Sequence, residues 1–214
     1  MLSQSGSLNL AEIQAEASST WALLVAGVLF IIGFGVKTAL VPLHTWLPDA
    51  HAQAPSGISD MLSGVVIEAG LVAMLKTIAA LAGISLLWGP ILMVFGALNM
   101  LAGNLLALRQ TQVKRMLAYS SLVHVGYMLL GLGVAFYAGD ASAAQGGLFH
   151  MLNHGFMKGL AFLSAGVLLF TLHIAVGEHG PLTVSDLAGA AKRYPIAAFT
   201  FSLALLSLGG IPPL

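Results

Sequence analysis

The sequence predicts an all-α fold, a polytopic transmembrane helix bundle with about six spans. Of the 214 residues, 58% are hydrophobic and only 7% are charged, whereas soluble domains carry about 25% charged residues. The mean hydropathy is +0.93. The apolar residues gather in long segments without the alternating pattern of strands, and a backbone in lipid must satisfy its own hydrogen bonds. These segments are therefore expected to be helices.

Six apolar segments are long enough to cross a bilayer, which takes roughly 20 residues. They are Trp21–Leu40, Ile58–Ala82, Leu86–Leu108, Met116–Ala138, Gly147–Val176 and Tyr194–Leu214. Residues 1–20 lack the basic start of a signal peptide and carry Glu12 and Glu16, so they are expected to form a polar or interfacial lead-in. Residues 21–214 are expected to form one transmembrane domain. We expect this domain to be truncated at its C-terminus, because the last apolar run has no polar tail.

Two spans carry signs of broken helices. Pro42 follows the first apolar run, and Pro212 lies in the last one after two glycines. Proline removes a backbone donor and clashes with the preceding turn. In a membrane such a break persists where protein or a water-filled cavity receives the freed backbone groups, as in many transporters. A simple kink or helix end is the alternative at Pro42.

The basic residues predict an orientation. Arg109, Lys114 and Arg115 lie in the third connection, and Lys192 and Arg193 lie in the fifth. Both connections are on the same side of a six-span protein, which the excess of basic residues assigns to the cytoplasm. The first connection, residues 44–55, is expected on that side too. The net charge of zero argues against a nucleic-acid partner, and the absence of cysteine excludes thiolate or iron–sulfur ligation in this chain.

Ionisable residues within the apolar segments are the main functional signal, because a central charge costs about 2.5–3.5 kcal/mol even on lenient insertion scales. Lys37 lies deep in the first segment, although its side chain could extend to the interface. Glu68 lies near the middle of the second segment, where a structural carboxylate is the alternative. Lys76 follows eight residues later, so Glu68 and Lys76 could share one face and form a pair.

The fifth segment has the sharpest pattern. His150, His154 and Lys158 follow one another at intervals of four residues, which places them on one helix face. Histidines at this spacing can also share a zinc ion. A metal site is disfavoured here, because no further deep ligand is evident and Lys158 would repel a cation. The pattern favours a row of titratable groups.

A further histidine, His124, lies in the fourth segment among the hydroxyl residues Tyr119, Ser120, Ser121 and Tyr127. These hydroxyls could support a chain of water molecules or simply satisfy a buried imidazole. Histidine titrates near neutral pH, and buried lysine also changes its charge readily, so the set is suited to carrying protons. No phosphate-binding loop or nucleophile motif is present. We therefore expect no catalytic residues, no cofactor and no metal site in this chain.

Three stretches closely resemble the signature of one family. They are GFGVKTALVPLHTWLPDAHAQAP at 33–55, ALRQTQVKRMLAYSSLVHVGY at 107–127 and LFHMLNHGFMKGLAFL at 148–163. They resemble the proton-translocating, antiporter-like subunits of respiratory NADH:quinone oxidoreductase (complex I). The same family includes Mrp-type cation/proton antiporters and membrane subunits of membrane-bound hydrogenases. The resemblance covers nearly all of residues 21–214.

The resemblance implies roles for individual residues. Lys37 matches the lysine on the broken helix of the first half-channel, and His150, His154 and Lys158 match titratable positions of the second half-channel. His124 matches a histidine position between them. Glu68 stands where the family usually has a central lysine, so Lys76 could take over that role or pair with Glu68. Full subunits have about fourteen helices in two inverted repeats, and this chain resembles the second repeat with its approaches.

The resemblance also implies a function. It indicates a proton-translocating membrane subunit of a complex I-like NADH (or ferredoxin/hydrogen):quinone oxidoreductase, in a plasma or inner membrane. Its partners would be other membrane subunits and the lipid bilayer, and redox catalysis would take place outside this chain. The alternatives are a subunit of an Mrp-type cation/proton antiporter and a structural membrane scaffold that conducts no ions.

Overall fold

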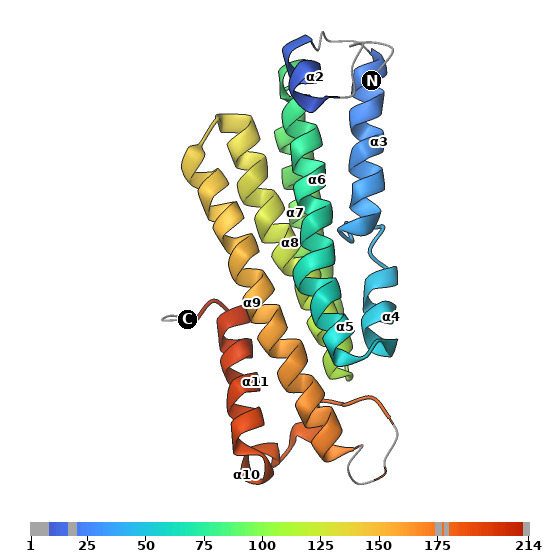
Figure 1. Cartoon of the computed structure of the whole chain (residues 1–214), viewed down its shortest axis with the longest axis vertical. Coiled ribbons are helices and arrows are strands. Elements are labelled where there is room, and N and C mark those ends of the chain that lie inside the picture. Colours follow the sequence, from blue (N-terminus) through green and yellow to red (C-terminus); the bar gives the residue numbers. More distant parts are fainter. Residues whose placement is uncertain (1–8, 17–20, 174–176, 178–179, 212–214) are drawn as a thin grey trace.

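The computed structural model describes residues 9–16, 21–173, 177 and 180–211, and every element in this part of the chain is helical apart from one isolated bridge. Figure 1 shows long helices side by side, with α6, α7 and α8 in the middle, α3 on one side, and α9 with α11 on the other. The elements are α2 (Leu10–Glu16), α3 (Trp21–Lys37), α4 (Trp46–Gln53), α5 (Ser56–Met61), the π-helix η1 (Leu62–Val66), α6 (Ile67–Ala80), the 3₁₀ turn η2 (Ala82–Ile84), α7 (Trp88–Ala107), α8 (Val113–Ala138), α9 (Ala141–Leu172), the 3₁₀ turn η4 (Ser185–Leu187), α10 (Ala190–Arg193) and α11 (Pro195–Leu208).

The helices confirm the expected fold class. Four helices in the described residues are long and apolar enough to cross a membrane, namely 56–80, 88–107, 113–138 and 141–172. The first and last apolar segments form shorter helices, Trp21–Lys37 and Pro195–Leu208. The first helix is shorter than expected because the chain leaves the helix before Pro42 and resumes it only at Trp46. The expected break at Pro212 lies outside the described residues.

The break around Pro42 is stabilised by side chains that receive the freed backbone groups. Asn99 of α7 is fully buried, accepts a hydrogen bond from the Val41 N–H at 2.7 Å, and donates to the Ala39 carbonyl at 3.4 Å. The Trp46 indole donates to the Val36 carbonyl at 2.7 Å. Unpaired backbone groups are costly in lipid, so these contacts explain how a broken helix persists within the bundle.

Helices α7 and α8 meet without room for side chains. A Cβ atom added to Gly96 would lie 2.8 Å from the Gly126 carbonyl oxygen, and one added to Gly126 would lie 2.7 Å from the Gly96 oxygen. Small residues at such contacts let membrane helices approach backbone to backbone. This contact fixes α8 against the rest of the bundle.

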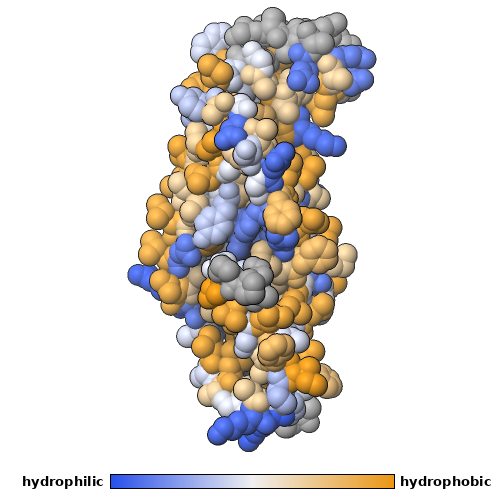
Figure 2. Space-filling view, turned by 90° about the vertical axis from the view of Figure 1, so that its left-hand side faces the viewer, coloured by the Kyte–Doolittle hydropathy of each residue, from blue (hydrophilic) through white to orange (hydrophobic). Residues whose placement is uncertain are grey.

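The surface of the bundle is largely apolar. Figure 2 shows the side on which α9 and α11 lie, and hydrophobic residues cover much of it, with hydrophilic areas at mid-height and near both ends. Exposed side chains on these helices include Phe149 at 66%, Phe156 at 74% and Ile196 at 81% exposure. Large exposed apolar surfaces are rare on soluble monomers, and this surface is suited to lipid contact.

Candidate functional site: a row of titratable residues within the bundle

The centre of the site is a contact between Glu68 and His154. Glu68 lies on α6 directly after the π-helix η1, and the fully buried His154 lies on α9. The Glu68 Oε1 atom is 2.8 Å from His154 Nδ1. The two segments approach closely because Gly64 of η1 and Gly155 of α9 face each other. A Cβ atom added to Gly64 would lie 3.3 Å from the Gly155 carbonyl oxygen, and one added to Gly155 would lie 3.4 Å from the Gly64 oxygen. A carboxylate and an imidazole at this distance can share or exchange a proton.

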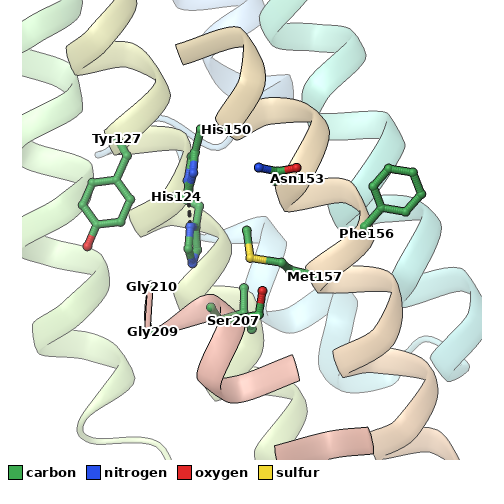
Figure 3. A pocket seen from close by; sticks show the side chains of 10 residues that line it. His124, Tyr127, His150, Asn153, Phe156, Met157, Ser207, Gly209 and Gly210 are labelled. Carbon is green, nitrogen blue, oxygen red and sulfur yellow. Dashed lines mark hydrogen bonds between the residues drawn. The ribbon is translucent and has the colours of Figure 1, made fainter. Parts of the chain in front are cut away.

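A second contact joins His124 of α8 to His150 of α9. The His124 Nδ1 and His150 Nε2 atoms are 3.0 Å apart, and Figure 3 shows the two rings directed at each other. The centre of the His124 ring also lies 5.1 Å from the centre of the His154 ring. Since Glu68 contacts His154, the four side chains form one continuous group.

This group opens into a cavity of about 530 Å³. The cavity is lined by His124, Tyr127 and His150, by Asn153, Phe156 and Met157 of α9, and by residues 207–210 at the end of α11 (Figure 3). The hydrophilic area at mid-height in Figure 2 lies on this side of the molecule. The histidine pair is therefore the point at which the buried group meets an accessible space.

Lys158 continues the row along α9, on the side away from the cavity. It is fully buried, and its Nζ atom donates a hydrogen bond to the Leu117 carbonyl oxygen at 2.8 Å. No acidic side chain forms an ion pair with Lys158 among the described residues. Burying a lysine with a single carbonyl as its hydrogen-bond partner costs free energy of folding. A residue that persists at such a cost is more typical of a functional site than of a structural role.

His51 extends the row further, although it is not one of the site residues predicted from the sequence. It is fully buried on α4, its ring stacks on Phe162 with centres 4.7 Å apart, and it interacts electrostatically with Lys158 and Lys114. Neither ring nitrogen has a hydrogen-bond partner among the described residues, a state that costs roughly 1–3 kcal/mol per group. Residues 44–55 are expected from the sequence to form a connection between two spans, so His51 is not predicted as a member of the site.

The row ends at a second cavity of about 500 Å³, lined by residues 52–55, Gln112, Lys114, Leu169 and residues 180–182. Lys114 donates to the Ala54 carbonyl at 2.8 Å, and Arg115 forms an ion pair with Asp49, so both fasten α4 to the start of α8. These contacts hold α4, which carries His51, beside this cavity. Electrostatic interactions link His51 to Lys114 and Lys158, and Lys158 to His154, whose ring adjoins the His124–His150 pair.

Two of the expected site residues lie apart from this row. Lys37 is exposed at the end of α3, and its side chain lies over Gly70, with Cγ 3.0 Å from where a Cβ of Gly70 would stand. Lys76 is exposed and lines a shallow apolar groove with Leu132 and Leu148. Glu68 contacts His154, and no contact with Lys76 is recorded within the described residues. In the same part of the chain, no three or more His, Cys, Asp or Glu side chains are arranged to hold a metal ion.

The fold and the site define an integral membrane protein of the α-helical, polytopic class. The family model described as "NADH:quinone oxidoreductase/Mrp antiporter, TM" matches residues 1–214. The chain therefore belongs to this family, as the three sequence stretches indicated.

Proteins similar in sequence include the hydrogenase-4 component B of Escherichia coli (strain K12), which is 37% identical over 221 residues. The NADH-quinone oxidoreductase subunit N 1 of Sorangium cellulosum (strain So ce56) is 36% identical over 207 residues. These matches cover 99% and 93% of this chain, but only 32% and 39% of the two relatives. The chain thus spans between a third and two fifths of the length of such relatives.

Two solved structures share the fold. One is the archaeal membrane-bound sulfane sulfur reductase, a respiratory membrane complex, with a TM-score of 0.82 and 30% identity over 99% of this chain and 42% of the other. The second is the Mrp complex from Dietzia sp. DQ12-45-1b, with a TM-score of 0.85 and 26% identity over 99% of this chain and 38% of the other. The Mrp complex is one of the kinds of assembly that the sequence resemblance implied.

Proposed function

We propose that this chain carries protons through the membrane as part of a subunit of a complex I-like NADH (or ferredoxin/hydrogen):quinone oxidoreductase. The observation that supports this most directly is the row of titratable residues between two cavities. It consists of Lys114, His51, Lys158, His154 with Glu68, and the His124–His150 pair. Glu68 and His154 are 2.8 Å apart, and His124 and His150 are 3.0 Å apart, which is close enough for direct proton transfer. The other steps would pass through water molecules. Redox chemistry would take place in partner subunits, because this chain has no cysteine and no cofactor motif.

The order of the residues in the row suggests a separate step of proton transfer for each of them. Lys158 would hold a proton in the fully buried centre, with His51 loading it from the cavity beside Lys114. The Glu68–His154 pair would accept the proton, and the His124–His150 pair would deliver it to the other cavity. Lys37 and Lys76 would pass protons between this row and parts of the subunit that lie beside α3 and α6. Changes in charge at one member alter the proton affinity of its neighbours, which couples the steps.

The same proposal extends to sidedness and organisation. The cavity beside Lys114 would face the cytoplasm, together with the connections that contain Arg109–Arg115 and Lys192–Arg193, because basic residues concentrate there. Residues 21–214 would form the antiporter-like domain, and residues 1–20 its lead-in. The partners would be the other membrane subunits of the complex.

A test is Lys158→Met in the assembled complex, with proton translocation measured by a pH-sensitive dye in sealed vesicles. We expect translocation to fall by about a hundredfold or more, the usual contribution of a positioned proton donor, while the amount of assembled complex stays the same. Lys192→Met is the matched control, since Lys192 is exposed and far along the chain from the row. Normal translocation in Lys158→Met would contradict the proposal and favour a structural scaffold.

A second candidate function, an Mrp-type cation/proton antiporter subunit, is favoured by the TM-score of 0.85 with an Mrp complex. The two candidates differ in what drives the protons. In vesicles containing the complex, acidification driven by NADH or another electron donor supports the redox complex. Acidification driven by a sodium gradient without any electron donor supports the antiporter.

A further inference from the structure

A groove on the outer surface, separate from the titratable row, lies between α9 and α11. It has a volume of about 410 Å³ and is lined by Val167, Thr171, Arg193, Tyr194, Pro195, Ile196, Ala197 and Thr200. Val167 is 50% and Ile196 is 81% exposed, so the groove opens onto the apolar surface that Figure 2 shows. It runs along α11 from Pro195 to Thr200, roughly 9 Å at 1.5 Å per residue.

Away from Arg193 and Tyr194 at one end of the groove, the polar side chains that line it are the two threonines, Thr171 and Thr200. The Thr171 hydroxyl donates to the Val167 carbonyl at 2.9 Å, and the Thr200 hydroxyl donates to the Ile196 carbonyl at 3.1 Å. Both hydroxyls are therefore satisfied within their own helices. Such a surface accepts a hydrocarbon chain without the cost of burying an unpaired polar group.

The rim is basic. Arg193 is the charged residue that lines the groove, and Lys192 precedes it on α10. Both side chains are exposed, and neither forms an ion pair in the part of the chain that the structure describes. The Tyr194 hydroxyl donates to the Thr171 carbonyl at 3.1 Å and fixes the rim to α9. Tyrosine and basic residues together are typical of the interface between lipid headgroups and the hydrocarbon.

We propose that this groove binds an anionic phospholipid, with its phosphate on Arg193 and Lys192 and one acyl chain along α11 between Val167 and Thr200. The charge complementarity decides the class of lipid, because guanidinium groups bind phosphate through paired, charge-assisted hydrogen bonds. The length of the groove fits the upper part of an acyl chain in a leaflet whose hydrocarbon is about 15 Å thick. This binding does not depend on the proposed proton function. It would fasten α11 to the end of α9.

The test uses the purified complex after exposure to vesicles of equal parts phosphatidylglycerol and phosphatidylcholine, with retained lipid counted by mass spectrometry. We expect the protein to retain phosphatidylglycerol in preference. Arg193→Gln should reduce this preference by about fivefold, the effect of one basic residue near a lipid surface. Arg109→Gln is the matched control, because Arg109 is an exposed arginine in another connection and should leave the preference unchanged. Ala197→Trp should fill the groove and remove the retained lipid while Arg193 remains.

Three outcomes would overturn the proposal. Equal retention of the two lipids by the unchanged protein would show that the groove has no selectivity for charge. Displacement of the lipid by inorganic phosphate at the same concentration would show a phosphate site without an acyl-chain site. An Ala197→Trp variant that assembles normally and keeps its preference for phosphatidylglycerol would show that the lipid does not lie in this groove.

Discussion

Helix α8 meets α7 on one side and α9 on the other, and the two contacts are built from different residues. Towards α7, glycines such as Gly96 and Gly126 bring the backbones into direct contact. Towards α9, His124 contacts His150, and the Leu117 carbonyl receives Lys158. In the first contact, even a Cβ atom added to Gly96 or Gly126 would lie under 3 Å from the facing backbone. The second keeps polar groups at hydrogen-bond distances beside a cavity.

Under the proposed function, α8 would contribute to stability through one face and to proton transport through the other. The close contact with α7 holds α8 in place, because close packing tolerates little displacement. Proton transfer on the opposite face would change hydrogen bonds without moving the helix. Damage to the first contact should therefore reduce the amount of folded protein, whereas damage to the second should reduce transport in a protein that still assembles.

The largest effect is expected for Gly96→Leu. Even a Cβ atom at this position would lie 2.8 Å from the Gly126 oxygen and 3.0 Å from the Leu130 nitrogen, so a leucine side chain forces α7 and α8 apart. Overpacking of this kind costs typically 1–3 kcal/mol and more when backbone is displaced. We expect the level of assembled protein in the membrane to fall severely. Gly146→Leu is the control, since nothing lies within 4 Å of a Cβ there, and a similar loss in both variants would contradict the role of the contact.

A smaller and more specific effect is expected for the Glu68–His154 pair. Glu68→Gln and His154→Gln should each lower proton translocation by about tenfold or more, while the assembled protein remains at its normal level. The double variant should be about as active as either single variant, because the second change removes a partner that has already lost its function. The measurement is proton translocation in sealed vesicles for the two single variants and the double variant.

Lys76 provides a second possible partner for Glu68, against which the Glu68–His154 pair can be tested. Lys76 and Glu68 lie on the same helix, and the sequence predicted that they could pair, but Lys76 lines an apolar groove and Glu68 contacts His154. Lys76→Met combined with Glu68→Gln should therefore give losses that add. Non-additive losses for Glu68 with Lys76, and additive losses for Glu68 with His154, would show that the functional pair is the one predicted from the sequence.

Much of the fold could be predicted from hydropathy, because lipid requires helices and the length of an apolar run sets the length of a span. The ends of the helices were harder to predict. The stretch after Lys37 is apolar enough to be counted with the first span, but Pro42 stops the helix, and Asn99 from a distant helix accepts a hydrogen bond from the Val41 N–H. A single asparagine in an apolar run gives no indication of its partner.

The site was predicted in part. Spacing alone placed His150, His154 and Lys158 on one face of α9, since a helix has a fixed period. The contact between Glu68 and His154 joins residues 86 positions apart, so it depends on how the helices pack and not on any local pattern. His51 was missed because the short helix α4 has a polar sequence typical of a connection, and burial by Phe162 becomes evident only in three dimensions.

The smallest effect is expected for Asp186→Asn, which removes a charge outside both contacts of α8. Asp186 accepts hydrogen bonds from the Thr183 N–H at 2.8 Å and from the Thr183 hydroxyl at 2.6 Å, and lies 3.2 Å from His173 Nε2. The Thr183 hydrogen bonds, with a smaller contribution from His173, hold the pKa of the Asp186 carboxyl below its ordinary value. A lowered folded-state pKa contributes stability that is present above the unfolded pKa of about 3.9 and is lost as pH falls through the folded pKa.

At pH 7 we therefore expect Asp186→Asn to lower the thermal unfolding midpoint of the detergent-solubilised protein by at most about 2 °C, because exposed interactions are screened by water. The difference from the unchanged protein should begin to shrink as the pH falls below about 4, where the unfolded state takes up a proton before the folded state, and should vanish once the pH is below the lowered folded-state pKa. Proton translocation at pH 7 should be unchanged, since Asp186 lies in the connection after α9 and contacts no member of the titratable row in the described residues. A loss of translocation as large as that in Glu68→Gln would show that charge in the connections, and not only on the α9 face of α8, takes part in moving protons.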